Sequence, residues 1–128
     1  MKEYNSVSEP FLADVRAVVG DANVFTEPEK LEQYKTDEEY DPRRFRVPEA
    51  VVRPANAEEI AAVVKLCNKY NVPLTVRSGG TSLADGAIAV CGGIVLLMER
   101  LNKIIEMNTE AMYVVAEAGV RTVDIQKM

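Results

Sequence analysis

The residues whose types and spacing could do chemistry lie between positions 73 and 86, in the run Pro-Leu-Thr-Val-Arg-Ser-Gly-Gly-Thr-Ser-Leu-Ala-Asp-Gly. Its two adjacent glycines allow positive φ angles, so that several backbone N–H groups can point outward together. Such a nest of amides attracts anions, and we expect one arginine and three hydroxyl side chains to add a positive charge and further donors around it. The predicted site residues are Val76, Arg77, Ser78, Gly79, Gly80, Thr81 and Ser82.

The expected guest of this loop is a phosphate or diphosphate, although the loop matches neither common phosphate-binding motif. It contains no G-x-x-x-x-G-K-[ST] sequence, and its glycines at 79, 80 and 86 do not make G-x-G-x-x-G. A strand that ends in a tight turn, with ordinary solvated Ser and Thr residues, explains the same composition. From the residues alone, an anion site and a plain turn remain alternatives.

The chain of 128 residues contains no histidine and two cysteines, Cys67 and Cys91. No Ser-His or Cys-His nucleophile pair can therefore be built from it, and a metal site of the usual Cys/His kind is excluded. We predict no catalytic residue and no metal ligand in this sequence, and we expect a cofactor or another segment to carry any catalysis. Both cysteines are interpreted as reduced and structural.

Acidic side chains are concentrated in the first part of the chain. Residues 1–50 carry 7 basic and 12 acidic side chains, whereas residues 51–128 carry 8 of each. This balance argues against a nucleic acid partner, which needs a basic face to neutralise phosphates. We interpret the run Asp37-Glu38-Glu39-Tyr40-Asp41 as a solvated acidic loop; a docking surface for a basic partner is the alternative.

The sequence contains no recognisable targeting signal. The N-terminus has no apolar segment typical of a secretion signal, and no run of 18 apolar residues occurs. We therefore predict no membrane span and expect a cytoplasmic protein.

The elements beside the loop are expected to place it at a sheet edge. Residues 50–53 are typical of a short strand, and Asn56 with Glu59 supplies the start of a helix over 57–70. A strand over 73–76 follows, so the three elements make a βαβ unit with parallel strands. The loop then leaves the carboxyl end of a parallel strand, where open α/β sheets bind ligands.

The remaining pattern completes a fold of the α+β class, with a small mainly parallel sheet flanked by helices and followed by a hairpin. We expect a buried strand at 94–97 and hairpin strands at 104–107 and 112–116. Outside these strands we expect a helix from a Ser8 cap to Val19 and a capping box at 26–29 that opens a helix through 34. An irregular connector is expected over 35–49, and a last helix over 123–127 is expected to be capped by Thr122. The predicted division is an N-terminal region of helices and acidic connector, 1–49, and a loop-bearing region, 50–128.

Four stretches of the chain, in this order and spacing, resemble one family. They are VVRPANAEEI at 51–60, VPLTVRSGGTSL at 72–83, GGIVLLMERLNKI at 92–104 and AEAGV at 116–120. They resemble the N-terminal part of the flavin-binding domain in FAD-linked oxidases of the vanillyl-alcohol oxidase and p-cresol methylhydroxylase type. The similarity is greatest to the D-lactate dehydrogenase and glycolate oxidase branch.

The resemblance implies that residues 77–82 bind the diphosphate of FAD, mostly through backbone amides. Some family members link a histidine to the flavin at the position that Thr81 occupies here, so non-covalent FAD is predicted. The Asp85 side chain is expected to point away from the diphosphate. The implied fold is the first subdomain of a type-2 FAD-binding domain.

By the same resemblance, the sequence is the first part of a flavin-dependent oxidoreductase, acting on a 2-hydroxy acid of the lactate or glycolate type. The catalytic residues and the site for this small-molecule substrate are then expected C-terminal to residue 128. We expect the present chain to be inactive by itself, to bind FAD weakly and to self-associate. A stand-alone nucleotide- or anion-binding module without catalysis is the alternative.

Overall fold

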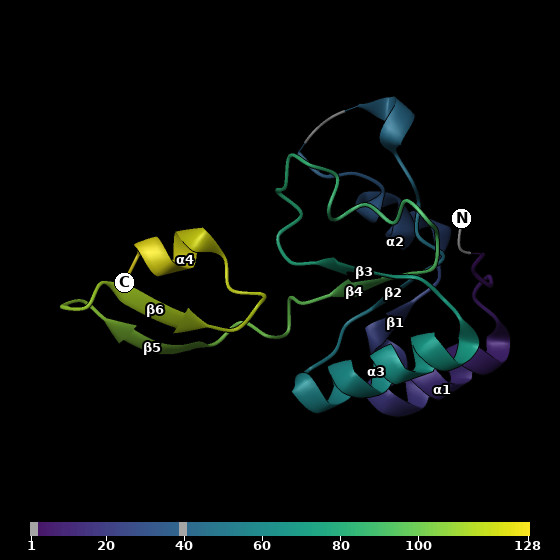
Figure 1. Ribbon diagram of the computed structural model, residues 1–128, viewed down its shortest axis with the longest axis horizontal. Helices are drawn as coiled ribbons and strands as arrows, with labels where there is room; N and C mark the ends of the chain where they lie inside the picture. The colour runs from purple at the N-terminus through teal and green to yellow at the C-terminus, as the bar shows by residue number, and fades with distance from the viewer. Residues whose placement is uncertain (1–2, 39–40) are drawn as a thin grey trace.

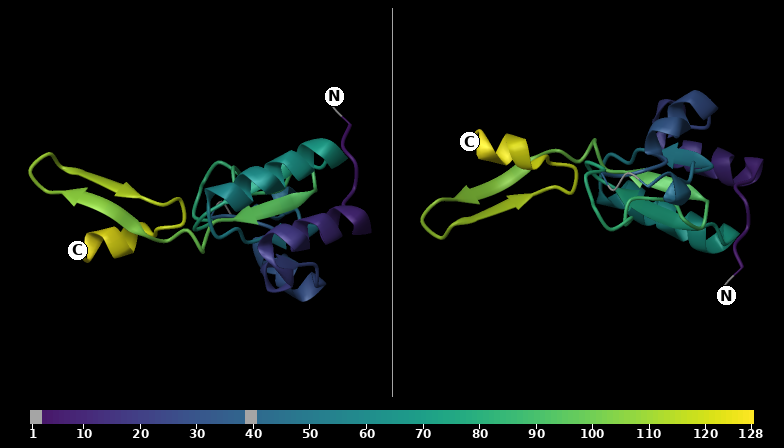
Figure 2. Two further views of the ribbon diagram at one scale, coloured as in Figure 1. Left: turned by 90° about the horizontal axis from the view of Figure 1, so that it is seen from below. Right: turned by 90° about the horizontal axis from the view of Figure 1, so that it is seen from above.

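The computed structural model describes residues 3–38 and 41–128, which form two lobes (Figure 1). The sheet lobe, residues 3–101, contains a four-stranded sheet with helices. The hairpin lobe, residues 102–128, contains two strands and one short helix and projects from one end of the sheet lobe (Figure 2). Glu39 and Tyr40 of the predicted acidic loop lie outside the described residues.

The main sheet contains the predicted parallel strands and one strand that was not predicted. Its order is β1 (Val24–Phe25), β2 (Ala50–Val52), β4 (Ile94–Leu97) and β3 (Leu74–Arg77). The strands β2, β4 and β3 are parallel, which confirms the βαβ unit, and β4 inserts between its two strands. The antiparallel strand β1 pairs with β2. With two residues, β1 is too short to show an alternating pattern in the sequence.

Two long helices cover one face of this sheet, side by side (Figure 1). The helix α1 (Glu9–Val19) begins after Ser8, whose hydroxyl accepts the N–H of the third helical residue, and ends at Gly20 with φ 89°. The helix α3 (Ala57–Tyr70) begins after Asn56, whose side chain also accepts a helical N–H. Both predictions are confirmed, because these caps are local signals that packing leaves in place.

The short helical segments of the sheet lobe lie in its N-terminal part. Glu27 occupies the N-cap position of the helix α2 (Pro28–Leu31), but no side chain accepts the first N–H groups of this helix. The capping box predicted at Thr26 is therefore wrong: the carboxylate of Glu27 instead accepts the N–H of Thr26 at 3.2 Å. Single 3-10 turns occur at Asp21–Asn23, Glu32–Tyr34 and Pro42–Arg44.

The core fills both faces of the sheet. A large cluster lies between the sheet and helices α1 and α3, and includes Phe11, Val63 and Ile94. A smaller cluster on the other face includes Leu31, Val51 and Val95. All four residues of β4 are buried, as the sequence predicted. The parallel strands are therefore fixed in place, and the loops at their carboxyl ends start from rigid positions.

The hairpin lobe has the predicted hairpin but no buried residue among positions 102–128, all of which are described. Its strands β5 (Ile104–Asn108) and β6 (Tyr113–Ala116) are antiparallel, with an irregularity in register after Ile104. The helix α4 (Thr122–Gln126) has Arg121 as its cap, so the prediction of Thr122 as the cap is wrong. Several of the protein's exposed large apolar side chains lie in this lobe: Ile105, Met107, Met112, Tyr113, Val115, Val123 and Met128.

Within residues 3–38 and 41–128, no helix has the length and apolar composition that a membrane crossing requires.

Candidate functional site

The loop after β3 has two features of an anion nest, a glycine with positive φ and consecutive N–H groups without partners among the described residues. Gly80 has φ 70°, and it is the only one of the two predicted glycines with a positive φ. The backbone N–H groups of Gly79, Gly80 and Thr81 donate no hydrogen bond to any residue that the structure describes. Since these donors lie at or near the surface, they are available to a ligand. Adjacent unpaired N–H groups form the concave kind of site that binds phosphate oxygens.

A cavity of about 360 Å³ opens at this loop. Its lining includes all the predicted site residues except Arg77, together with two residues from the far end of the loop. The lining residues are Val76, Ser78, Gly79, Gly80, Thr81, Ser82, Gly86 and Ala87. The predicted residues are thus brought together around one space, at the carboxyl end of β3.

Arg77 lies behind the loop instead of lining its cavity. Its Nη1 donates to the carbonyl oxygen of Thr36 at 2.7 Å, and its Cζ lies 5.4 Å from the centre of the Tyr34 ring. A Cβ atom at Gly80 would lie 2.7 Å from the same Cζ, so the guanidinium packs directly against the loop backbone. Burial lowers the pKa of Arg77. The positive charge therefore stays next to the nest, while Nη1 donates to Thr36 and not into the loop cavity.

The hairpin lobe forms the opposite wall of the site. A cavity of about 410 Å³ is lined by Ser78 and Gly79 together with Glu99, Gly119 and Arg121. A third cavity, of about 450 Å³, also joins Ser78 and Gly79 to Arg121. Arg121 is ion-paired to Asp124, with 2.9 Å between Nε and Oδ2. The sequence interpretation did not name Arg121, although it directly follows the recognised stretch 116–120.

A glycine brings the hairpin lobe close to the sheet lobe. The N–H of Gly119 donates to the carbonyl oxygen of Leu101 at 2.7 Å. A Cβ atom at this position would lie 2.8 Å from that oxygen and would also overlap the carbonyl of Met98. Only a residue without a side chain fits there, so Gly119 determines how near the second wall lies to the loop.

Asp85 and Asp37, two acidic residues beside the loop, have hydrogen-bond or ion-pair partners and do not line the loop cavity. Asp85 has φ 62° and forms an ion pair with Arg44, and it does not line the loop cavity. Asp37 is only 7% exposed and accepts a hydrogen bond from the hydroxyl of Ser82. The interpretation of residues 37–41 as a solvated loop is therefore wrong for Asp37, while Glu38 is exposed as expected.

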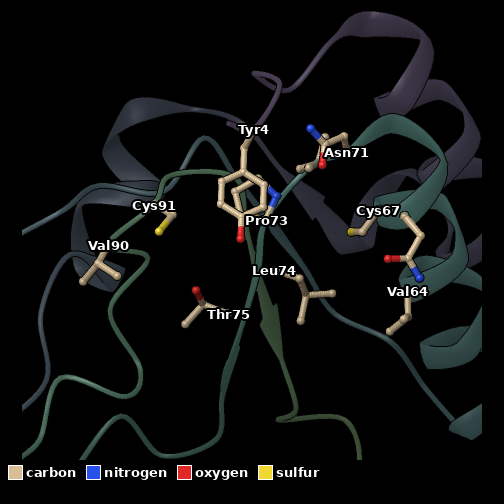
Figure 3. A pocket seen from close by; sticks show the side chains of 11 residues that line it. Tyr4, Val64, Cys67, Asn71, Pro73, Leu74, Thr75, Val90 and Cys91 are labelled. Carbon is tan, nitrogen blue, oxygen red and sulfur yellow. The ribbon is translucent and has the colours of Figure 1, made fainter. Parts of the chain in front are cut away.

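A separate cavity of about 360 Å³ lies at the other end of β3. Figure 3 shows Val90 and Cys91 on one side of it and Val64 and Cys67 on the other. None of its lining residues is charged, so it offers no partner for a diphosphate. Both cysteines are free, and the exposure of Cys91 contradicts a structural role for that thiol. Among the described residues, no three acidic or cysteine side chains converge as a metal site would require.

Comparison with known proteins identifies the family of the chain. Residues 48–128 match the model of a family described as an FAD binding domain. Over 84 residues the chain is 34% identical to the glycolate oxidase subunit GlcD of Bacillus subtilis, covering 66% of this chain and 18% of that protein. Over 78 residues it is 37% identical to a D-lactate dehydrogenase of Anaerostipes hadrus, covering 61% of this chain and 16% of that protein.

The fold also matches that of a solved structure. The structure of p-cresol methylhydroxylase with substrate bound superposes with a TM-score of 0.78 at 25% identity, over 94% of this chain and 25% of that one. The match thus spans less than a fifth of the length of each of these two curated relatives. The chain belongs to the FAD-binding domain family of the vanillyl-alcohol oxidase and p-cresol methylhydroxylase type.

Proposed function

We propose that this chain binds the diphosphate of FAD in a flavin-dependent oxidoreductase that oxidises a 2-hydroxy acid such as lactate or glycolate. The observation that carries the proposal is that Gly79, Gly80 and Thr81 line one cavity while their N–H groups have no partner among the described residues. The substrate class rests on the names of the relatives, a glycolate oxidase subunit and a D-lactate dehydrogenase. When bound, FAD supplies the redox chemistry by accepting electrons from the substrate.

Each part of the loop has a separate role in this proposal. The amides of residues 79–81 bind the diphosphate oxygens, and the hydroxyls of Ser78 and Thr81 add donors at the cavity wall. Arg77 fixes Gly80 from behind and keeps a positive charge close to the anion. Arg121 lies across the cavity and can exchange its exposed partner Asp124 for a phosphate oxygen.

The proposed attachment of FAD is non-covalent, and its affinity for this chain is low. Thr81 has a hydroxyl where some family members carry the histidine that links to the flavin. A few charge-assisted hydrogen bonds contribute about 1.5–3 kcal/mol each, whereas association itself costs about 4–15 kcal/mol. These terms nearly cancel, so further contacts to the adenine and flavin rings, from outside this chain, are needed for tight binding. A sub-micromolar dissociation constant for this chain alone would contradict that estimate.

The test is a titration of the chain with FAD, with riboflavin and with inorganic pyrophosphate. Nuclear magnetic resonance of the backbone amides monitors each titration. FAD is expected to shift the resonances of Gly79, Gly80 and Thr81, and riboflavin is not, because only FAD carries the diphosphate. The variant Gly80→Ala should lose these shifts, since its Cβ overlaps Arg77 and φ 70° disfavours a side chain.

Gly92→Ala is the matched control for this substitution. Gly92 has φ 78°, so an alanine there experiences the same backbone strain, but the residue lies at the amino end of β4 and does not line the loop cavity. FAD should shift the loop amides of this variant as in the wild type. The anion-binding module would be favoured instead by two results together. Pyrophosphate and FAD would shift the loop amides equally, and a longer chain would bind FAD no more tightly than it binds pyrophosphate. Absence of any loop shift in the wild type would contradict the proposed function.

A further inference from the structure

One short segment of the N-terminal region, residues 34–37, lies against the back of the loop. We propose that Asp37 is a positioning residue that holds the loop over residues 78–85 in its diphosphate-binding conformation. The proposal rests on the proposed function for the identity of the ligand, but not for the positioning itself. It assigns a role to a region that the family match, residues 48–128, does not include.

Asp37 fixes the carboxyl-terminal end of the loop with one oxygen atom. Its Oδ2 accepts the hydroxyl of Ser82 at 2.7 Å and the N–H of Asp85 at 3.0 Å. Next to it, the N–H of Glu38 donates to the carbonyl oxygen of Ser82 at 3.1 Å. A carboxylate that is 7% exposed is costly to bury without such partners, and hydrogen bonds to a charged acceptor are stronger than neutral ones.

The same segment fixes the beginning of the loop. The carbonyl oxygen of Thr36 accepts from Arg77, and the ring of Tyr34 lies over the Arg77 guanidinium. The two ends of the loop are therefore anchored by neighbouring residues of one segment. Residues 79–81 between the anchors make no backbone hydrogen bonds of their own among the described residues, so their order depends on these anchors. A loop ordered before binding loses less entropy when the ligand arrives.

The backbone at Asp85 shows why an anchor is needed there. Asp85 has φ 62°, a strained conformation for a residue with a side chain. One of its carboxylate oxygens, Oδ1, is also buried without a hydrogen-bond partner among the described residues. Such a strained conformation persists only where the surroundings hold it. The hydrogen bond from its N–H to Asp37 and the ion pair with Arg44 are the contacts that do so.

Three substitutions test the positioning role. Asp37→Ala removes both hydrogen bonds, and we expect the affinity for FAD to fall about tenfold, the effect of losing roughly 1.4 kcal/mol of binding free energy. Asp37→Asn keeps an oxygen that can accept from both donors, so it should bind FAD nearly as the wild type does. Glu38→Ala is the control: it removes the adjacent, exposed carboxylate, keeps the backbone N–H that donates to Ser82, and should leave the affinity unchanged.

The measured quantities separate positioning from general stability. Binding is followed at the amides of residues 79–81, and hydrogen exchange is followed at the Asp85 amide. In the wild type this amide should be protected from exchange, and in Asp37→Ala it should exchange rapidly while amides of β4 stay protected. An unprotected Asp85 amide in the wild type would overturn the proposal without any variant, which keeps it testable if Asp37→Ala does not fold.

The proposed function and the positioning role fail in different ways. If Asp37→Ala binds FAD as tightly as the wild type, the positioning role is wrong and the proposed function stands. If FAD shifts no loop amide even in the wild type, the proposed function is wrong, and the exchange of the Asp85 amide alone then decides the positioning role.

Discussion

The strands β4 and β6 are similar in length and apolar character and opposite in environment. Both have four apolar residues, Ile-Val-Leu-Leu in β4 and Tyr-Val-Val-Ala in β6. Every residue of β4 is buried, whereas no residue of β6 is. The difference lies in what covers them. The strand β4 is central in a four-stranded sheet with a core on both faces, and β6 belongs to a two-stranded hairpin beside a helix of five residues.

This difference places the candidate site between a stable lobe and a labile one. A two-stranded hairpin is marginally stable by itself in water, so the hairpin lobe depends on its contacts with the sheet lobe. The loop after β3 belongs to the stable lobe, and Arg121 on the opposite wall belongs to the labile one. A ligand that contacts both walls is therefore expected to order the hairpin lobe more than the sheet lobe.

The largest expected effect is that of Gly93→Ala in the sheet lobe. Gly93 has φ 73°, and a Cβ there would lie 2.7 Å from Cγ of Pro73 and would overlap the carbonyl oxygen of the same residue. Because main-chain atoms block the new side chain, we expect the free energy of unfolding to fall by about 3–4 kcal/mol. Urea-induced unfolding followed by circular dichroism measures this change.

Gly86→Ala is the control for that substitution, because no atom lies within 4 Å of the position that its Cβ would take. Its free energy of unfolding should stay within about 0.5 kcal/mol of the wild type. A loss of similar size in both variants would show that the cost comes from glycine replacement in general and not from the contact with Pro73.

The second prediction compares one chemical change in the two lobes. Val95 in β4 is fully buried, and Val115 in β6 is 43% exposed. Val95→Ala should lower the free energy of unfolding by about 2 kcal/mol, since it removes buried methyl groups and leaves a cavity. Val115→Ala should lower it by less than about 0.5 kcal/mol. Equal losses in urea unfolding would mean that the hairpin lobe is buried as deeply as the sheet lobe.

The third prediction concerns Gly119, where the hairpin lobe contacts the sheet lobe. Gly119→Ala pushes the carbonyl groups of Met98 and Leu101 away, and so loosens the hairpin lobe from the sheet lobe. Hydrogen exchange of the β5 and β6 amides should accelerate, while the global free energy of unfolding changes by less than about 1 kcal/mol. Accelerated exchange throughout β4 as well would contradict this picture, because it would show that the two lobes unfold together.

The sequence predicted the elements whose signals are local. Ser8 and Asn56 carry cap side chains, and the apolar patterns of α3, β4 and the hairpin are continuous in the chain. The order of the strands was not predictable in the same way, because the position of β4 between β2 and β3 depends on contacts between distant residues. The residues of the loop were named from their types, and the structure places all but Arg77 around one cavity.

What the sequence missed in the site is set by tertiary packing. Arg77 is directed backward because Tyr34 and Thr36 offer it partners, and those lie about forty residues earlier in the chain. Asp37 stands in an acidic run, and charge runs are usually solvated, so its burial could not be predicted from composition. Arg121 belongs to the site only because Gly119 lets the hairpin lobe approach the loop.

The smallest expected effect concerns the two thiols, which differ in burial within one lobe. Cys67 lies in the core, and burial raises the pKa of its thiol to about 11 from an ordinary value of 9.0. Cys91 is exposed, so a thiol reagent should label it at once. In a Cys91→Ser variant, labelling of Cys67 should proceed only as fast as the protein unfolds.

The unfolded chain releases the Cys67 proton at lower pH than the folded one, so this thiol contributes less to stability as the pH rises from about 9 to about 11. The thermal midpoint of Cys67→Ala should therefore fall less steeply over that range than the midpoint of the wild type, and parallel curves would show that Cys67 is not buried as a neutral thiol.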